Sequence, residues 1–223
     1  MTDIAVTILV VAKAPVPGLA KTRLAATVGD LAAADIAAAA LLDTLDAVAA
    51  TPCAARVVAI TGDLDRASHR DEIRGRLSAF TVVDQRGDGF AERLANAHAD
   101  AAAVAGDRPV LQIGMDTPQV TPELLGFCGQ ALLDAPAVLG MARDGGWWVL
   151  GVRSAEMAAC LRDVPMSTSE TGALTHMALQ HNAIDVTLLP DLHDVDTVDD
   201  VDTVRDVCPP GSRFADATRM AGV

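Results

Sequence analysis

The chain has 223 residues and a mass of 23.0 kDa, which is enough for one large domain with a full hydrophobic core. Its 17 basic and 30 acidic side chains give a net charge of −13 and exclude a non-specific nucleic-acid binder, because that class is basic. An anionic substrate would need local cations, a metal ion or a helix N-terminus to offset this overall charge.

Strand-like and helix-like segments alternate along the chain. The first strand is predicted over residues 4–12, an uninterrupted apolar run rich in β-branched residues. A Pro/Gly-rich loop and an Ala-rich helix over 30–50 follow, with Asp30 as its N-cap. Further strands are predicted over 56–61, 80–84, 109–113, 137–141, 147–152 and 183–189, and further helices over 64–77, 90–105, 121–133 and from the capping box at 167–170 to 181. This spacing predicts an α/β fold with a mostly parallel central sheet and helices on both faces.

Domain organisation and compartment follow from the same pattern. A single domain is predicted over residues 1–207, followed by a loosely ordered tail over 208–223, where periodicity is weak. The apolar run at 4–12 is too short to cross a bilayer and no basic segment precedes it, so we expect neither a membrane span nor export. Four widely spaced cysteines without a CxxC pair argue against zinc or disulfide frameworks. The sequence thus predicts a cytoplasmic protein, and formation of a homo-oligomer stays open.

The loop after the first strand is a candidate anion site. Strand, glycine-bearing loop and helix form the phosphate-binding arrangement of many nucleotide sites, although this loop has neither the GxxxxGK[ST] nor the GxGxxG pattern. The chain has 15 arginines but only two lysines, and both lie here, as Lys13 and Lys21. At a phosphate, arginine does not replace the compact charge of lysine. With Gly18, Thr22 and Arg23, they are predicted to bind phosphate; the alternative is a surface turn with solvated cations.

Asp116 follows the predicted strand at 109–113 in the sequence Gly-Met-Asp-Thr-Pro. It therefore lies at the carboxyl end of a central strand, where ligands bind in open α/β sheets. A carboxylate there can hold Mg²⁺ or Mn²⁺, which take oxygen ligands and bridge phosphates. The alternative is an aspartate that caps the next turn.

Asp144 opens the segment Asp-Gly-Gly-Trp-Trp. Gly145 and Gly146 would let the backbone approach a ligand, an aspartate can accept hydrogen bonds from sugar hydroxyls, and a tryptophan face suits stacking on a sugar or base. Neighbouring residues of a strand point to opposite faces, so at most one tryptophan, taken as Trp147, lines the site and the other is core; the alternative for either one taken singly is a core position.

Two further segments are candidates. The acidic stretch 191–206 offers a second metal carboxylate, Asp196 or Asp194, unless it is only a solvated helix start that the helix dipole favours. Residues 87–93 form a glycine turn into a helix, and Gly87 and Arg93 could approach a substrate or simply begin that helix.

Together these segments resemble a known family. They are similar to the transferase family often found beside radical-SAM/selenodomain proteins, some of whose members are named arsenosugar-biosynthesis glycosyltransferases. That family belongs to the nucleotide-diphospho-sugar transferase superfamily, which has the Rossmann-like glycosyltransferase-A fold. The matching stretches occur in family order, at residues 12–18, 21–24, 87–93, 114–118, 144–148 and 194–197.

The resemblance implies a metal-dependent glycosyltransferase that uses a nucleotide-sugar donor, a small-molecule acceptor and Mg²⁺ or Mn²⁺. It implies catalytic roles for Asp116 and Asp144 and a metal site at Asp116 and Asp196. The implied nucleotide- and phosphate-binding residues are Ala12, Lys13, Gly18, Lys21, Thr22, Arg23, Gly87 and Arg93, and the implied substrate residues are Gly145, Gly146 and Trp147.

Two alternatives remain. The Lys-Thr-Arg-Leu element at 21–24 is shared with 2-phospholactate guanylyltransferases of the same fold. A nucleotidylyltransferase that takes a nucleoside triphosphate and releases pyrophosphate is therefore the second reading. The third is a non-catalytic nucleotide-binding protein.

Overall fold

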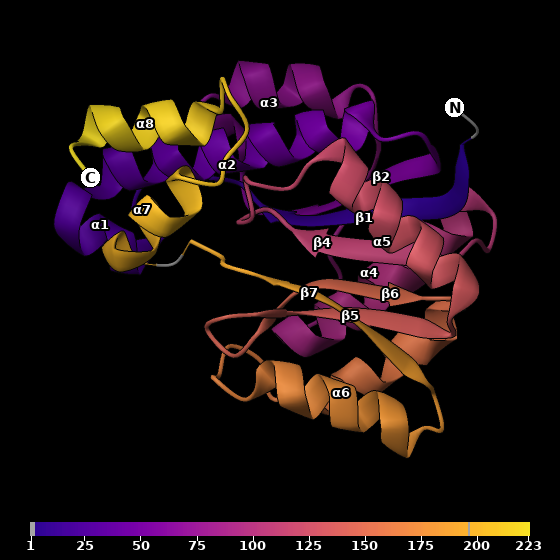
Figure 1. Ribbon diagram of the computed structural model, residues 1–223. Helices are drawn as coiled ribbons and strands as arrows, with labels where there is room; N and C mark the ends of the chain where they lie inside the picture. The colour runs from indigo at the N-terminus through magenta and orange to yellow at the C-terminus, as the bar shows by residue number, and fades with distance from the viewer. Residues whose placement is uncertain (1–2, 196) are drawn as a thin grey trace.

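The computed structural model describes residues 3–195 and 197–223, and these form a seven-stranded sheet surrounded by helices (Figure 1). The strands are β1 (Ile4–Lys13), β2 (Cys53–Thr61), β3 (Thr81–Asp84), β4 (Val110–Gly114), β5 (Ala137–Ala142), β6 (Trp147–Val152) and β7 (Val186–Leu192). The helices are α1 (Thr22–Val28), α2 (Asp30–Ala50), α3 (Arg70–Leu77), α4 (Phe90–Ala105), α5 (Pro122–Asp134), α6 (Thr171–His181), α7 (Val198–Arg205) and α8 (Arg213–Ala221), with 3₁₀ segments η1 (Leu64–Arg66) and η2 (Ala155–Asp163).

The strand order is β3-β2-β1-β4-β6-β5-β7. Neighbouring strands are parallel except where β6 pairs with β4 and β5 in the antiparallel sense. The α/β fold with a mostly parallel sheet, expected from the sequence, is therefore confirmed. Val11 of β1 pairs with Gly114 of β4, so the loops that follow these two strands leave from the same edge of the sheet.

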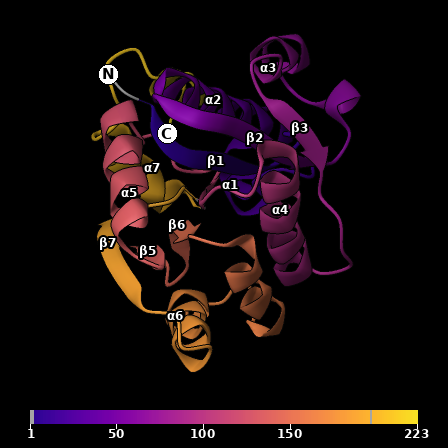
Figure 2. The same ribbon diagram turned by 90° about the vertical axis from the view of Figure 1, so that its right-hand side faces the viewer.

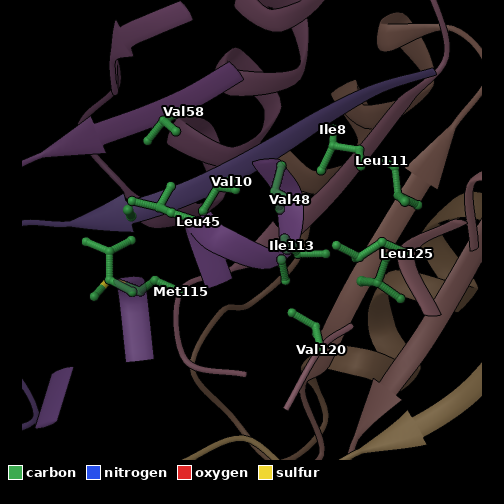
Figure 3. Packing of buried hydrophobic residues seen from close by; sticks show 14 of the residues in the cluster. Ile8, Val10, Leu45, Val48, Val58, Leu111, Ile113, Met115, Val120 and Leu125 are labelled. Carbon is green, nitrogen blue, oxygen red and sulfur yellow. The ribbon is translucent and has the colours of Figure 1, made fainter. Parts of the chain in front are cut away.

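Both faces of the sheet are covered. Ile8 and Val10 of β1 pack with Leu45 of α2 and Leu125 of α5 on one face (Figure 3). Alternate residues such as Leu9 pack with α4, η2 and α6 on the other, and Figure 2 shows α5 and α4 on either side of the sheet. Burial on both sides explains why β1 is an uninterrupted apolar run instead of an alternating one. No helix in the described residues is long and apolar enough to cross a membrane.

Several helical segments differ from the sequence-based expectation, among them η2, which the sequence analysis did not predict. The helix predicted over 64–77 is divided into η1 and α3, because His69 between them has a left-handed backbone with φ 54°, which a continuous right-handed helix does not accommodate. The loop after β1 contains a short helix, α1, which the sequence did not indicate and which begins directly after Lys21.

The expectation of a loosely ordered tail is wrong for residues 213–221. These form α8, and Phe214 is fully buried in a cluster with Leu24 and Val201. Asp43 of α2 fixes the start of α8, since its carboxylate accepts hydrogen bonds from Ser212 Oγ at 2.7 Å and from Phe214 N at 3.0 Å. The tail is therefore part of the same folded unit as α2.

A buried histidine is expected to make the stability pH-dependent. His98 of α4 is fully buried, and burial lowers the pKa of its imidazole to about 4, although the neighbouring Gln112 side chain offsets part of this effect. In the unfolded chain the pKa of a histidine is about 6.5. Below that pH the histidine of the unfolded state is protonated, whereas His98 of the folded state stays neutral. The free energy of unfolding therefore falls as the pH drops from about 6.5 toward 4.

We expect this one group to remove about 1.4 kcal/mol of stability per pH unit between about pH 6 and pH 4. Denaturant unfolding of the natural protein and of His98→Asn at several pH values isolates the contribution of His98 to the free energy of unfolding, since the two proteins share all other titrating groups. The difference between the two free energies of unfolding should change with pH in that window. A pH-independent difference would contradict a buried neutral His98.

Candidate active site

Three loops meet where β1, β4 and β7 end. The loop after β1 leads to Lys21, the loop after β4 carries Asp116, and the segment after β7 leads toward α7, which lies near α1 in Figure 1. Val195 N donates to the backbone carbonyl of Asp116 at 3.3 Å, and Gln119 Nε2 donates to the carbonyl of His193. These bonds hold the segment after β7 against the Asp116 loop.

Lys21 lies at the centre of this group. Its backbone is left-handed, with φ 47°, and its side chain is only 9% exposed. Nζ lies 3.0 Å from Asp116 Oδ1 and also donates to the carbonyl of Val195. The ammonium therefore points into the protein and not into solvent, and it joins two loops that are far apart in sequence.

The other candidate phosphate-binding residues precede or follow Lys21 in the chain. Lys13 Nζ donates to the carbonyl of Leu19 at 2.9 Å and closes the loop on itself. Gly18 has φ +77°, a left-handed conformation that glycine adopts without strain. Thr22 and Arg23 form the first turn of α1.

Negative charge is concentrated around the Lys21 ammonium. Burial raises the pKa of Asp194 to about 6, with further upward contributions from the charges of Asp144 and Asp116 and a downward one from Lys21. The carboxylates of Asp144 and Asp116 thus lie close enough to Asp194 for their charges to act on it. Asp194 is one of the two metal ligands that the sequence offers in this stretch; the other, Asp196, lies outside the described residues.

Asp144 lies in the tight turn between β5 and β6. Its Oδ1 accepts a hydrogen bond from Gly146 N at 2.7 Å. Gly145 has φ +93°, and a Cβ built on it would lie 1.9 Å from the carbonyl oxygen of Ser169. The carbonyl of Gly145 in turn accepts from Gly172 N of α6 at 2.8 Å. In this structure the glycine therefore allows close approach of the segment that begins α6.

The two tryptophans lie on opposite faces of β6. Trp148 is 2% exposed, and its Nε1 donates to the carbonyl of Pro190 at 2.9 Å, so it is the core residue of the pair. Trp147 is half-buried and packs against the other core cluster, which includes Leu139.

Gly87 and Arg93 lie after β3, two strands from β1 in the sheet. Gly87 has φ +130°, and Asp88 N donates to Glu92 Oε2 at 3.0 Å, which shapes the turn into α4. The Arg93 guanidinium lies 5.7 Å from the centre of the Phe90 ring, and its buried Nε has no hydrogen-bond partner among the described residues. Gln85, two residues before Gly87, donates to the carbonyl of Ala12 at 2.8 Å, so the segment that leads to this turn lies against the end of β1.

Residues 44–168, more than half of the chain, match the profile of a family described as an uncharacterized protein conserved in bacteria (DUF2064). The chain belongs to the DUF2064 family. No match was found among curated proteins.

Several solved structures are similar to this DUF2064 protein. A candidate nucleotide-diphospho-sugar transferase from Desulfovibrio desulfuricans G20 is 25% identical, with a TM-score of 0.84 over 100% of this chain and 96% of that one. A cytidylyltransferase from Leptospira borgpetersenii is 15% identical, with a TM-score of 0.57 over 98% of this chain and 94% of that one. Rv0371C from Mycobacterium tuberculosis, solved as a manganese complex, is 19% identical, with a TM-score of 0.54 over 90% and 97%. The expected nucleotide-diphospho-sugar transferase fold is confirmed.

Asp116 and Asp194 offer carboxylate oxygens, the type of group that Mg²⁺ and Mn²⁺ prefer. Among residues 3–195 and 197–223, no three His, Cys, Asp or Glu side chains lie close enough together to hold an ion. Mg²⁺ in phosphate-transfer sites is typically held by one or two carboxylates together with substrate phosphates. Asp116 Oδ1 is buried and has no hydrogen-bond partner in the described residues besides its ion pair with Lys21. That oxygen and the crowded charge of Asp194 fit a cation of this kind.

Two contributors to the site were missed in the sequence. Val195 contributes only backbone groups, to Lys21 and to Asp116, and a backbone contact leaves no signal in residue type. Gln85 Nε2, just after β3, donates to the carbonyls of Ala12 at 2.8 Å and Ala59 at 3.0 Å. Its position after a strand was the available signal.

Proposed function

We propose that this DUF2064 protein is a metal-dependent glycosyltransferase that uses a nucleotide-sugar donor. The observation that carries the proposal is the group formed by Lys21, Asp116 and Asp194 at the carboxyl edge of a mostly parallel sheet. Ligands of open α/β sheets bind at that edge. The likeness to the Desulfovibrio protein over the whole chain supports a transferase acting on nucleotide-linked substrates.

In this proposal the N-terminal loop binds the nucleotide. Lys13 and Lys21 would hold the diphosphate, because their ammonium groups lie at either end of the segment that follows β1. The nucleotide-binding set is completed by Ala12, Gly18, Thr22, Arg23, Gly87 and Arg93.

Asp116, together with Asp194 or Asp196, would hold Mg²⁺ or Mn²⁺. A bound ion of this kind offsets the negative charge that develops on the departing nucleoside diphosphate. The chain's own cations act in the same direction, because Lys21 lies in a partly buried setting where its charge is weakly screened.

Asp144 would contact the transferred sugar or a small-molecule acceptor. Gly145 and Gly146 hold its carboxylate in a fixed turn, and Trp147 flanks that turn on β6.

We place the enzyme in the cytoplasm, because Cys53, Cys128, Cys160 and Cys208 are all free thiols, as a reducing compartment maintains them.

A nucleotidylyltransferase is the second candidate. Lys13, Lys21 and Arg23 suit a triphosphate, and the Leptospira neighbour is a cytidylyltransferase. The Leptospira protein is only 15% identical to this chain, which supports a shared fold but not a shared reaction. We therefore favour glycosyl transfer.

The reaction product separates the two enzymes. We expect slow release of a nucleoside diphosphate from at least one nucleotide sugar with Mn²⁺, because water often replaces a missing acceptor. Incubation with panels of nucleotide sugars and nucleoside triphosphates, followed by separation of the products, tests this. Pyrophosphate from a triphosphate, with every nucleotide sugar intact, would establish the second candidate instead. Binding of nucleotides without turnover of either panel would indicate a non-catalytic protein.

A further inference from the structure

The ion pair between Lys21 and Asp116 occupies a ligand position of the proposed metal site. The Lys21 side chain is 9% exposed, and its ammonium lies 3.0 Å from the buried Oδ1 of Asp116. The same ammonium donates to the carbonyl of Val195. Lys21 is therefore held in place by two groups from different loops.

A divalent cation bound to Asp116 would meet this ammonium at close range. Two positive charges in a partly buried site repel each other strongly, since little water or salt screens them. As long as Lys21 contacts Asp116, the protein alone should bind a metal there weakly. A diphosphate offers the lysine another anionic partner, and its flexible stem allows it to turn toward one.

We propose that Lys21 couples the binding of metal to the binding of nucleotide. In the free protein it competes with the metal for Asp116; when a diphosphate binds, Lys21 moves to the phosphates and leaves the carboxylate to the metal. This inference rests on the proposed function, because it takes a diphosphate and a divalent metal as ligands of the site. Each ligand favours the state in which Lys21 has left Asp116, so each raises the affinity for the other by the same factor.

The coupling also reaches the segment after β7. Lys21 is bonded to the carbonyl of Val195, whose N–H is bonded to the Asp116 loop, and Asp194 lies directly before it. If Lys21 leaves, the segment after β7 loses its hydrogen bond from the Lys21 ammonium. It keeps the hydrogen bond that Gln119 donates to the carbonyl of His193. The position of Asp194 relative to Asp116 would therefore respond to the same event.

Binding of Mn²⁺ alone tests the proposal without turnover. We would measure free Mn²⁺ by electron paramagnetic resonance during titration of the full chain, in the natural protein and in Lys21→Met, which keeps side-chain length but removes the charge. We expect Lys21→Met to bind Mn²⁺ at least about tenfold more tightly, within the usual range of coupling between two ligands. Mn²⁺ should also raise the melting temperature of this variant more than that of the natural protein.

Two matched variants identify the cause. Arg108→Met removes one positive charge from an exposed residue at the other end of β4 from Asp116, and should bind Mn²⁺ as weakly as the natural protein. Lys21→Met combined with Asp116→Asn should lose the gained affinity. If Lys21→Met does not fold, Lys21→Gln removes the same charge.

Equal or weaker Mn²⁺ binding by the folded Lys21 variant would overturn the proposal. Tighter binding that persists in the double variant, or that Arg108→Met reproduces, would do so too. The proposed glycosyl transfer would fail separately, by the absence of nucleoside diphosphate release in the product assay.

Discussion

Replacing Asp116 with asparagine is expected to lower kcat/KM for a nucleotide sugar by roughly 10²–10³-fold, the size of effect seen when one preorganised charge-stabilising group is removed. Asparagine keeps the size and shape of the side chain but loses the negative charge that would hold the metal. It also leaves the Lys21 ammonium without the carboxylate 3.0 Å away. Steady-state kinetics with varied Mn²⁺ measure the change.

The fold should survive this substitution. Breaking a fully buried ion pair costs about 3–5 kcal/mol, but exposed pairs contribute only about 0–1 kcal/mol. Asp116 is 41% exposed, and the Lys21 ammonium keeps its bond to the Val195 carbonyl. We therefore expect a loss of stability nearer the lower range, measured by denaturant unfolding.

Asp191→Asn provides the matched control. It makes the same change of charge on an exposed residue of β7, in the strand that leads to the site. Its kinetics should equal those of the natural protein. If Asp116→Asn folds and retains Mn²⁺-dependent turnover, the metal is held elsewhere.

The layout of the sheet could be predicted because each strand leaves a local signal. The apolar run of β1 reflects burial on both faces, and Asp116 directly after β4 marks a carboxyl end of the sheet. These inferences need only neighbouring residues and the known periodicity of strands. Position relative to a strand was therefore enough to find both the edge of the sheet and one of its carboxylates.

The internal partner of Lys21 could not be predicted. The sequence suggested a lysine free to meet phosphate, but its left-handed backbone and the contacts with Asp116 and Val195 join positions about a hundred or more residues apart. Only the folded chain brings such groups together. The burial of Phe214 was hidden for a related reason, since α8 is nine residues long and its anchor, Asp43, lies on α2.

Gly145 has a close neighbour in the structure that the sequence did not indicate, and this leads to a second large effect. The sequence suggested that the glycine admits a ligand, whereas in the structure a Cβ there would lie 1.9 Å from the carbonyl of Ser169. Gly145→Ala must therefore displace either the turn that carries Asp144 or the segment that begins α6. A shift of about 1 Å in a positioned group can cost about 10²-fold in rate. We expect a loss of that size in kcat/KM for a nucleotide sugar.

Gly29→Ala separates this clash from backbone strain. Gly29 has φ +85°, close to the +93° of Gly145, but a Cβ there meets nothing within 4 Å. Both glycines have a positive φ, and Gly29, with ψ 160°, lies in a region that is essentially restricted to glycine, so strain should cost each alanine variant about 1–3 kcal/mol of stability. Only Gly145→Ala should also lose activity, because only its Cβ moves the turn that holds Asp144. Equal activity of the two folded variants would show that the position of this turn does not matter for the reaction and would remove Asp144 from the active site.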